Sequence, residues 1–183
     1  MRRVDVTVTA EQPSDSSAVE QVVGAAFAPR TSVARMVAAI RCSPGYEPDL
    51  ALVARTAEGT VVGFVMVSHA ALVEADGREH DVLTLSPLAV APQVQGRGVG
   101  STLVRAVLGA AAARTDLPRV VVLEGSPVYY ERFGFVPAAD HGIELALPDG
   151  VPAAAAQVYL LPGDDTEHRR GRVRYAPAFD LLD

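Results

Sequence analysis

A glycine-rich turn between a predicted strand and a predicted helix carries the residues with the clearest potential for chemistry. Residues 95–100 read Gln-Gly-Arg-Gly-Val-Gly, and Ser101 follows. Glycines lack a Cβ and tolerate positive φ, so their main chain can approach a ligand closely. The first amides of the following helix have no intrahelical partner, and with the helix dipole they favour a bound anion. The sequence therefore predicts a phosphate cradle formed by the amides of residues 96–101.

Three glycine patterns distinguish between kinds of phosphate cradle. A P-loop needs a Gly-Lys-Ser/Thr ending, and this turn contains no lysine. The dinucleotide pattern Gly-x-Gly-x-x-Gly fails because Ser101 stands where the third glycine belongs. The pattern Gln/Arg-x-x-Gly-x-Gly/Ala is matched in full by Gln95, Gly98 and Gly100. A turn that serves only to start a helix is the plain alternative.

A second group of residues follows the next predicted strand. Ser126 and Pro127 are typical of a helix start, and Gly134 is typical of a helix end. Between them, Tyr130 begins the run Tyr-Glu-Arg-Phe-Gly-Phe, which matches the pattern tyrosine-x-Lys/Arg-x-Gly-Phe. The glycine turn and this run, in this order, resemble the two signatures of the GCN5-related N-acetyltransferase (GNAT) family.

The resemblance implies a fold, a cosubstrate and a set of contacts. The fold is α/β, with a mixed, mostly antiparallel sheet, a splayed central parallel pair and helices on both faces. The cosubstrate is acetyl-CoA, whose pantetheine arm would pair with the main chain of residues 88–90 like an added strand. Segments 125–137 and 174–179 further resemble a bacterial subgroup of predicted acetyltransferases with unassigned substrate. The residues implied to bind acetyl-CoA are Leu88, Ala89, Val90, Gln95, Gly96, Arg97, Gly98, Val99, Gly100, Ser101, Ser126 and Tyr130.

Acetyl transfer from a thioester to an amine needs a stabilised carbonyl oxygen, a proton for the leaving thiolate and a neutral amine. The family's tyrosine at the place of Tyr130 is assigned to the thiolate, and a phenol stays protonated at neutral pH. Tyr129 is the competing residue. A main-chain amide near Leu88 is expected to bind the developing oxyanion. The resemblance thus implies direct transfer of acetyl to a primary amine of a small molecule or protein, without a covalent enzyme intermediate.

The general base is less sharply defined by the sequence. Many relatives carry a glutamate on the strand before the glycine turn, where this chain has Thr84 and Ser86. Glu124, at the end of the next predicted strand, is a candidate base that could act through a water molecule. The alternatives among the titratable residues are His69, His80 and Asp81.

Patterns of apolar residues define the elements that must position these groups. The ranges expected to form strands are 4–8, 50–55, 61–68, 82–90, 120–123, a strand beginning at 135–136, 142–147, 156–161 and 171–175. Helices are expected at 14–28, 32–41, 101–114 and 128–133. Pro87 inside its strand predicts a bulge or a break in pairing. A strand, a crossover helix and a second strand around the glycine turn predict a parallel pair.

Length, charge and cysteine content limit the class of protein. The 183 residues suit one N-acetyltransferase domain, 1–183, with a core of about 4–162 and a C-terminal extension over 163–183. The net charge of −6 argues against nucleic acid and anionic membranes as partners. Cys42 is the single cysteine, which excludes an internal disulfide, and we expect it to be buried. No signal peptide or membrane span is recognised, so we expect a cytoplasmic monomer or homodimer.

Several other readings follow from what the sequence contains or lacks. No metal-ligand spacing is recognised, so no metal is expected. The arginines after His168 stand beside Asp164, Asp165 and Glu167, which favours a solvated mixed-charge loop over a nucleic-acid patch. Two rival functions remain: a non-catalytic sensor that binds acyl-CoA, and a nucleotide-binding protein of a different fold.

Overall fold

The computed structural model describes residues 3–163 and 169–182, which divide into two compact units. The first unit comprises residues 3–68, 86–110 and 177–182, and the second comprises residues 69–85, 111–163 and 169–176. Asp164, Asp165, Glu167 and His168 of the predicted mixed-charge loop lie outside the described residues. The assignment of the whole chain to a single domain stays a prediction.

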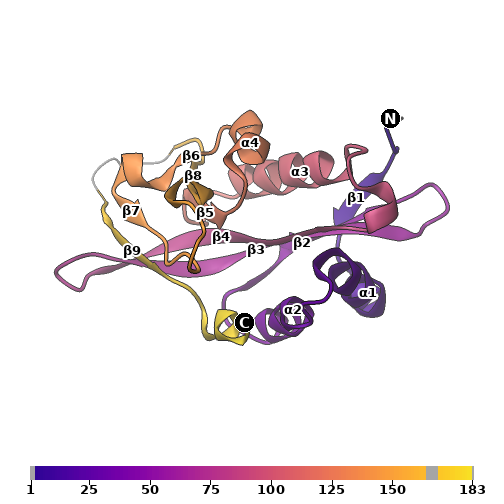
Figure 1. Ribbon diagram of the computed structural model, residues 1–183, viewed down its shortest axis with the longest axis horizontal. Coiled ribbons are helices and arrows are strands. Elements are labelled where there is room, and N and C mark those ends of the chain that lie inside the picture. Colours follow the sequence, from indigo (N-terminus) through magenta and orange to yellow (C-terminus); the bar gives the residue numbers. More distant parts are fainter. Residues whose placement is uncertain (1–2, 164–168, 183) are drawn as a thin grey trace. The chain divides into compact units, whose positions relative to one another are not determined.

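The first unit has helices on both faces of its strands. Figure 1 shows α1 and α2 on one side of β1 and β2 and shows α3 on the other. Its strands are β1 (Thr7–Ala10), β2 (Tyr46–Arg55), the first part of β3 (Val61–Val73) and the last part of β4 (Glu79–Val90). Its helices are α1 (Ser16–Phe27), α2 (Ser32–Arg41) and most of α3 (Val99–Ala113), with 3-10 turns at Pro13–Asp15, Pro92–Val94 and Pro177–Leu181.

Two helices of the first unit form because apolar residues recur at helical spacing and meet the sheet. The buried residues of this face on the helices are Val19, Val22, Val23, Val33, Met36, Val37 and Ile40. They form one core cluster with Phe64 and Met66 of β3. The predicted positions of α1 and α2 are thereby confirmed.

The first strand begins later than the sequence predicts. The alternation from Val4 predicts a strand over 4–8, whereas β1 begins at Thr7 and pairs with β2. Val4 is engaged elsewhere, because its N–H donates to the carbonyl oxygen of Arg97 at 3.1 Å. The start of the described chain is therefore tied to the glycine turn.

The second unit contains the parallel pair of strands. Besides the end of β3 and the start of β4, its strands are β5 (Val120–Glu124), β6 (Val136–Pro137), β7 (Ile143–Glu144), β8 (Ala156–Leu160) and β9 (Gly171–Arg174). Helix α4 (Pro127–Tyr130) continues into a 3-10 turn at Glu131–Phe133, and further 3-10 turns cover Ala138–His141 and Ala153–Ala155. The parallel register places Leu83 beside Val121 and Thr84 beside Val122. Aliphatic residues of β4, β5 and β8 form the core of this unit.

The strand order confirms the predicted fold class. The path is β1-β2-β3-β4-β5-β8-β6, and β9 pairs with β3 and β7. The pairs β1–β2, β2–β3, β3–β9, β5–β8 and β6–β8 are antiparallel, while β4–β5 and β7–β9 are parallel. This is a mixed, mostly antiparallel sheet with a central parallel pair and flanking helices.

Several strands differ in length from the prediction: β2 begins at Tyr46 and β4 at Glu79, each earlier than expected, and two strands that pair with β9 also differ. Strand β3 continues to Val73, beyond the predicted end at Ser68, because its residues 71–73 pair with β9. The strand predicted over 142–147 is reduced to Ile143–Glu144, which pairs with the start of β9.

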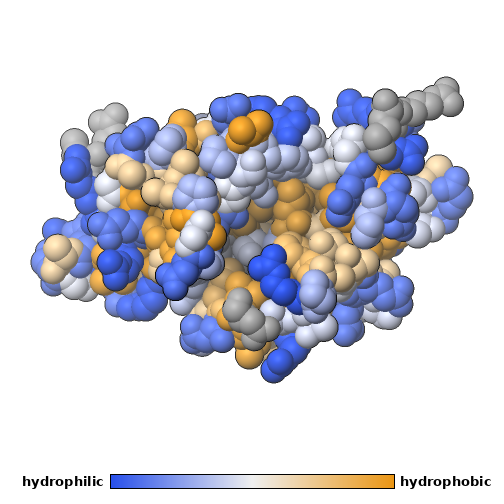
Figure 2. Space-filling view, in the orientation of Figure 1, coloured by the Kyte–Doolittle hydropathy of each residue, from blue (hydrophilic) through white to orange (hydrophobic). Residues whose placement is uncertain are grey.

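The turn between β3 and β4 forms a hydrophilic tip of the second unit, at the left of Figure 2. In this turn Arg78 pairs with Glu74 at 2.9 Å and with Asp76 at 2.8 Å. Both pairs are local and share the exposed side chain of Arg78, so they contribute little to stability.

Cys42 is exposed, so the prediction that it is buried is wrong. The residue is the C-cap of α2 and follows Arg41, beyond the face of the helix that packs on the sheet. Within 3–163 and 169–182, no helix has the length and hydrophobicity needed to cross a membrane.

Candidate active site

The glycine turn has the geometry of a strand–turn–helix unit in which side chain and main chain both fix the turn. The side-chain amide of Gln95 donates to the carbonyl oxygen of Val90 at 2.9 Å, so the glutamine closes the turn onto the end of β4. Gly96 and Gly98 have φ values of 69° and 93°, which L residues rarely adopt. These two positions therefore need glycine.

The first amides of α3 are open at this turn. Among the described residues, no main-chain carbonyl accepts a hydrogen bond from the N–H of Gly96, Gly98, Val99, Gly100 or Ser101. The first such bond after the turn runs from the N–H of Thr102 to the carbonyl of Gly98, at 3.0 Å. Free amides at a helix start suit an anion. The geometry agrees with the predicted cradle, and the binding of a ligand there stays a prediction.

The helix that follows the turn is seated directly on β3 at Gly63. A Cβ at Gly63 would lie 2.8 Å from Cδ1 of Leu103 and 2.9 Å from Cγ1 of Val99. Such a separation is too short for a side chain, so glycine allows the first turn of α3 to approach the strand closely. This contact with β3 fixes the start of α3, and with it the direction in which the open amides point.

Arg3 is a neighbour of the turn that the sequence did not identify. Its Cγ and Nε atoms are the nearest atoms to the place that a Cβ on Gly98 would take. An arginine at residue 3 has no pattern that ties it to residue 98, so only the fold brings the two together.

Tyr130 is a buried residue of α4 with a ring that packs closely on its surroundings. The residue is 9% exposed, and its ring makes edge contacts with Tyr129 and Phe135 at centroid distances of 4.9 and 5.6 Å. A side chain on Gly125 would collide with this ring, so the glycine makes room for it. Burial raises the pKa of the Tyr130 hydroxyl, which therefore stays protonated at neutral pH.

The start of α4 differs from its prediction in one detail. Ser126 is the N-cap residue, but its side chain makes no capping bond. Its carbonyl instead accepts from the N–H groups of Tyr129 and Tyr130, at 3.0 and 3.1 Å. The hydroxyl of Ser126 is therefore not needed to begin the helix.

Glu124 is the last residue of β5 and meets a tyrosine from the C-terminal segment. The hydroxyl of Tyr175 donates to Oε1 of Glu124 at 2.9 Å. Although the residue as a whole is exposed, partial burial of its carboxyl group raises the pKa of Glu124, and the bond from Tyr175 opposes that rise. A carboxylate whose pKa is raised accepts a proton more readily than an ordinary glutamate, which is a property that a general base needs.

Of the alternative bases, His80 is already paired with a carboxylate, and Thr84 stands where many relatives carry a glutamate. A ring nitrogen of His80, at the start of β4, lies 2.9 Å from Oε1 of Glu74 in the preceding turn. Thr84 is buried in β4 and is not titratable. Within the second unit, Glu124, Ser126 and Tyr130 come from one continuous stretch at the end of β5. Among the described residues, no group of three acidic, histidine or cysteine side chains could hold a metal.

Comparison with known proteins identifies the family. The family model for an acetyltransferase (GNAT) domain matches residues 47–137. YhbS of Escherichia coli K12, an uncharacterized N-acetyltransferase, is 33% identical over 131 residues, which cover 72% of this chain and 74% of YhbS. The chain belongs to the GNAT family. A second relative in that organism, the uncharacterized N-acetyltransferase YjhQ, is 35% identical over 137 residues, covering 74% of this chain and 72% of YjhQ.

Solved structures of the GNAT family agree with this assignment. The structure of E. coli YhbS in complex with CoA superposes with a TM-score of 0.84 at 27% identity, covering 98% of this chain and 94% of YhbS. A GNAT family acetyltransferase from Brucella melitensis in complex with acetyl-CoA gives a TM-score of 0.73 at 29% identity, covering 96% and 99%. The predicted class of enzyme, an acyl-CoA-dependent N-acyltransferase, is confirmed.

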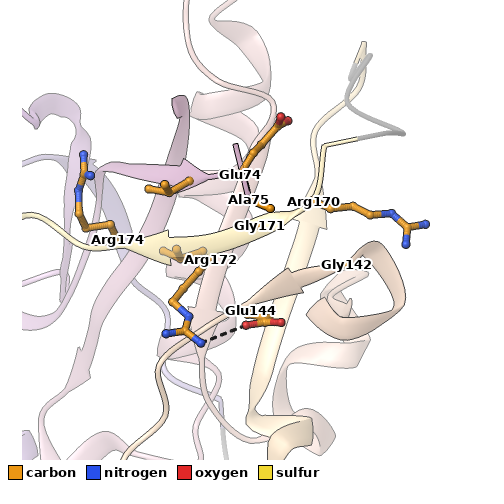
Figure 3. Close-up of a pocket in the computed structure, with 10 residues that line it drawn as sticks. Glu74, Ala75, Gly142, Glu144, Arg170, Gly171, Arg172 and Arg174 are labelled. Carbon is orange, nitrogen blue, oxygen red and sulfur yellow. Dashed lines mark hydrogen bonds and ion pairs between the residues drawn. The ribbon is translucent and has the colours of Figure 1, made fainter. Parts of the chain in front are cut away.

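The lining of a pocket of about 820 Å³ in the second unit contains none of the residues predicted for GNAT chemistry. It is lined by the end of β3 and by residues of β7 and β9 (Figure 3). On one side of the pocket, the guanidinium group of Arg172 lies 3.4 Å from a carboxylate oxygen of Glu144 (Figure 3). The guanidinium group of Arg174 binds the carboxylate of Glu79. Arginines that are paired with carboxylates offer little net charge to a ligand.

Proposed function

We propose that the protein transfers the acetyl group of acetyl-CoA directly to a primary amine of a small molecule or protein. The observation that carries the proposal is the glycine turn, with its open amides at the start of α3. A diphosphate is the kind of group that such amides hold well, and CoA carries one. The CoA and acetyl-CoA bound in the related structures support the same cosubstrate.

The remaining groups are assigned by the chemistry of the transfer. Main chain at residues 88–90 would pair with the pantetheine arm, and an amide near Leu88 would stabilise the oxyanion. Tyr130 would protonate the leaving thiolate, since burial keeps its hydroxyl protonated. Glu124 would accept the proton that the acceptor ammonium group must lose before its nitrogen can attack.

The experiment that tests the proposal is a screen of amine acceptors with detection of the free CoA thiol, using wild type, Tyr130→Phe and Tyr129→Phe. We expect Tyr130→Phe to lower kcat by about 10²-fold or more while acetyl-CoA still binds. Tyr129→Phe is the matched control and should retain most of the activity. Equal turnover of Tyr130→Phe and wild type would refute the role of Tyr130.

Binding measurements separate acetyl transfer from the two rivals. Tight binding of CoA with no turnover on a broad amine panel would favour a non-catalytic sensor over an enzyme. A thermal-shift comparison of CoA, NAD and ATP addresses the other rival, since a nucleotide-binding protein would prefer NAD or ATP. We expect stabilisation by CoA and acetyl-CoA alone.

A further inference from the structure

The hydrogen bond between Tyr175 and Glu124 joins two segments that lie 51 residues apart in the sequence. The oxygen–oxygen distance of 2.9 Å is within the range of O–H···O bonds. An ionised carboxylate can only accept, so the phenol is the donor. The bond therefore favours the ionised form of Glu124, which is the form that a general base needs.

The tyrosine is held in place by the two residues that precede it and by the packing of its own side chain. Tyr175 follows β9 directly, and Val173 of that strand is paired with Leu72 of β3. The guanidinium group of Arg174 binds both carboxylate oxygens of Glu79, at 2.8 and 2.6 Å. The half-buried Tyr175 side chain packs against the aliphatic core of the second unit. Its hydroxyl thus has a defined position.

Glu124 is held equally well at its main chain. It pairs with Ala156 of β8, and the N–H of Gly125 donates to the carbonyl of Ala155 at 2.9 Å. The buried side chain of Gln157 donates to the carbonyl of Gly125 at 3.0 Å. What the backbone leaves free is the rotation of the Glu124 side chain, and Tyr175 restricts that rotation.

The surroundings of Glu124 contain few groups that could compete with Tyr175. In the register of the sheet the partner of Glu124 on β8 is the apolar Ala156, the neutral Thr84 of β4 pairs two residues earlier with Val122, and α4 carries Tyr130. No charged side chain of the described residues shifts the pKa of Glu124, which responds to burial and to the bond from Tyr175. The effect of Tyr175 should therefore be measurable in isolation.

We infer that Tyr175 is a positioning residue that orients the carboxylate of Glu124 for removal of a proton from the acceptor amine. The inference rests on the proposed acetyl transfer. An acceptor ammonium group gives one proton to Glu124, and its nitrogen then forms a bond to the acetyl carbon. The carbon–sulfur bond breaks, and the thiolate takes a proton from Tyr130. The nitrogen of the new amide then loses a second proton, and this proton returns to Tyr130.

The test compares the pH dependence of kcat/KM in wild type, Tyr175→Phe, Glu124→Gln and Tyr159→Phe. Loss of the donated bond removes an interaction with the ionised carboxylate, so its pKa rises. We expect the acid limb of Tyr175→Phe to move to higher pH by roughly half to one unit. Glu124→Gln should lose about 10²-fold or more in kcat/KM and lack this limb. Tyr159→Phe is the control, because Tyr159 pairs with Val121 at the other end of β5 and its ring packs on Phe135.

A second measurement decides the inference without a known acceptor. The carboxyl resonance of Glu124 can be titrated by NMR in protein labelled with 13C-glutamate, and identified by its absence in Glu124→Gln. We expect a higher carboxyl pKa in Tyr175→Phe than in wild type, and an unchanged value in Tyr159→Phe. An unchanged pKa in Tyr175→Phe, with an unmoved acid limb, would overturn the inference even if the rate fell, because a merely structural role lowers the rate alike at every pH.

The failure of the inference and the failure of the proposed function give different results. Full turnover by Glu124→Gln would show that Glu124 is not the base, which overturns the inference about Tyr175. The proposed acetyl transfer would still stand. Absence of turnover by wild type on every amine, with CoA bound, refutes the proposed function instead. In that case the NMR titration still reports whether Tyr175 acts on the carboxylate.

Discussion

The side chain of Arg3 lies across Gly98, with its Cγ and Nε atoms each 3.3 Å from the place that a Cβ on Gly98 would take. The neighbouring Val4 donates its N–H to the carbonyl of Arg97, so the described start of the chain runs along the glycine turn. A basic side chain thereby stands beside the amides that we assign to the diphosphate. Glycine at residue 98 therefore has two roles: it allows the positive φ of the turn, and it leaves space for the side chain of Arg3.

Replacing Gly98 with Ala should weaken acetyl-CoA binding about tenfold or more, which corresponds to roughly 1.4 kcal/mol. The new methyl group would strain a residue at φ 93° and crowd the Arg3 side chain. Isothermal titration calorimetry with CoA measures the change. Gly109→Ala is the matched control, since nothing lies within 4 Å of the added methyl group in the middle of α3, and it should bind CoA like wild type. Equal affinities of the two variants would contradict this role of Gly98.

Replacing Arg3 with Gln should weaken CoA binding by about fivefold at low salt, since one charge near a phosphate contributes roughly 1 kcal/mol in water. The loss should shrink at high salt because counterions screen an exposed charge. Arg35→Gln, an equal change of charge on the exposed side of α2, serves as the control. Dephospho-CoA tells which phosphate is contacted: a retained loss points to the diphosphate, and a vanished loss points to the 3′-phosphate. Unchanged binding of both compounds at low salt would show that Arg3 contacts neither.

The glycine turn could be predicted from the sequence because its signals are local. Gln95, Gly98 and Gly100 are close neighbours in the chain, and the apolar patterns on either side define a strand and a helix. The same holds for Tyr130 and Gly134 around α4. The conformation of such short segments is determined by neighbouring residues, so it can be predicted without knowing which distant residues they contact.

Other features depend on contacts between distant residues and leave no trace in a local pattern. Tyr175 reads as an aromatic residue near the end of the chain, and only the pairing of β9 with β3 carries it to Glu124. Cysteine is among the residue types that are most often buried, but Cys42 lies one position past the end of α2 and is exposed. Gly125, by contrast, does carry a local signal, because a glycine between a buried strand and a helix start often marks a place where another part of the chain approaches the backbone closely.

Replacing Gly125 with Ala should lower kcat by roughly 10- to 100-fold while leaving CoA binding nearly unchanged. The added Cβ would lie 2.9 Å from Cδ2 of Tyr130 and closer still to Cε2, so the ring must move. Displacing the ring moves the hydroxyl that we propose as the proton donor to the thiolate. Steady-state kinetics and calorimetry together measure this split. Gly24→Ala, with open space around its added methyl group, should match wild type in both. A parallel loss of kcat and CoA affinity would indicate general damage to the fold.

The pair of the buried Asp15 and the partly buried Arg55 should stabilise the folded protein in a pH-dependent way. The side chain of Asp15 is 8% exposed and accepts from Arg55 and from the N–H of Gln12. We expect Asp15→Asn to reduce the free energy of unfolding by about 1–3 kcal/mol at pH 7, because Arg55 loses its charged partner. Urea unfolding followed by circular dichroism gives this difference directly.

The sign of the pH dependence follows from the direction of the shift in Asp15. The hydrogen bond from Arg55 lowers the pKa of Asp15 below its usual value of 3.8. The folded state therefore binds this proton less readily than the unfolded state, so the stabilisation is complete above that usual value and is lost as pH falls through the folded pKa. The difference between wild type and Asp15→Asn should be constant from pH 7 to about 5 and should narrow below pH 4. Asp116→Asn is the control, since Arg114 lowers the pKa of Asp116 to about 2 but the carboxylate is exposed, so solvent screens the pair and little stability is lost. A difference that stays constant down to pH 2 would show that Asp15 contributes through packing and not through its charge.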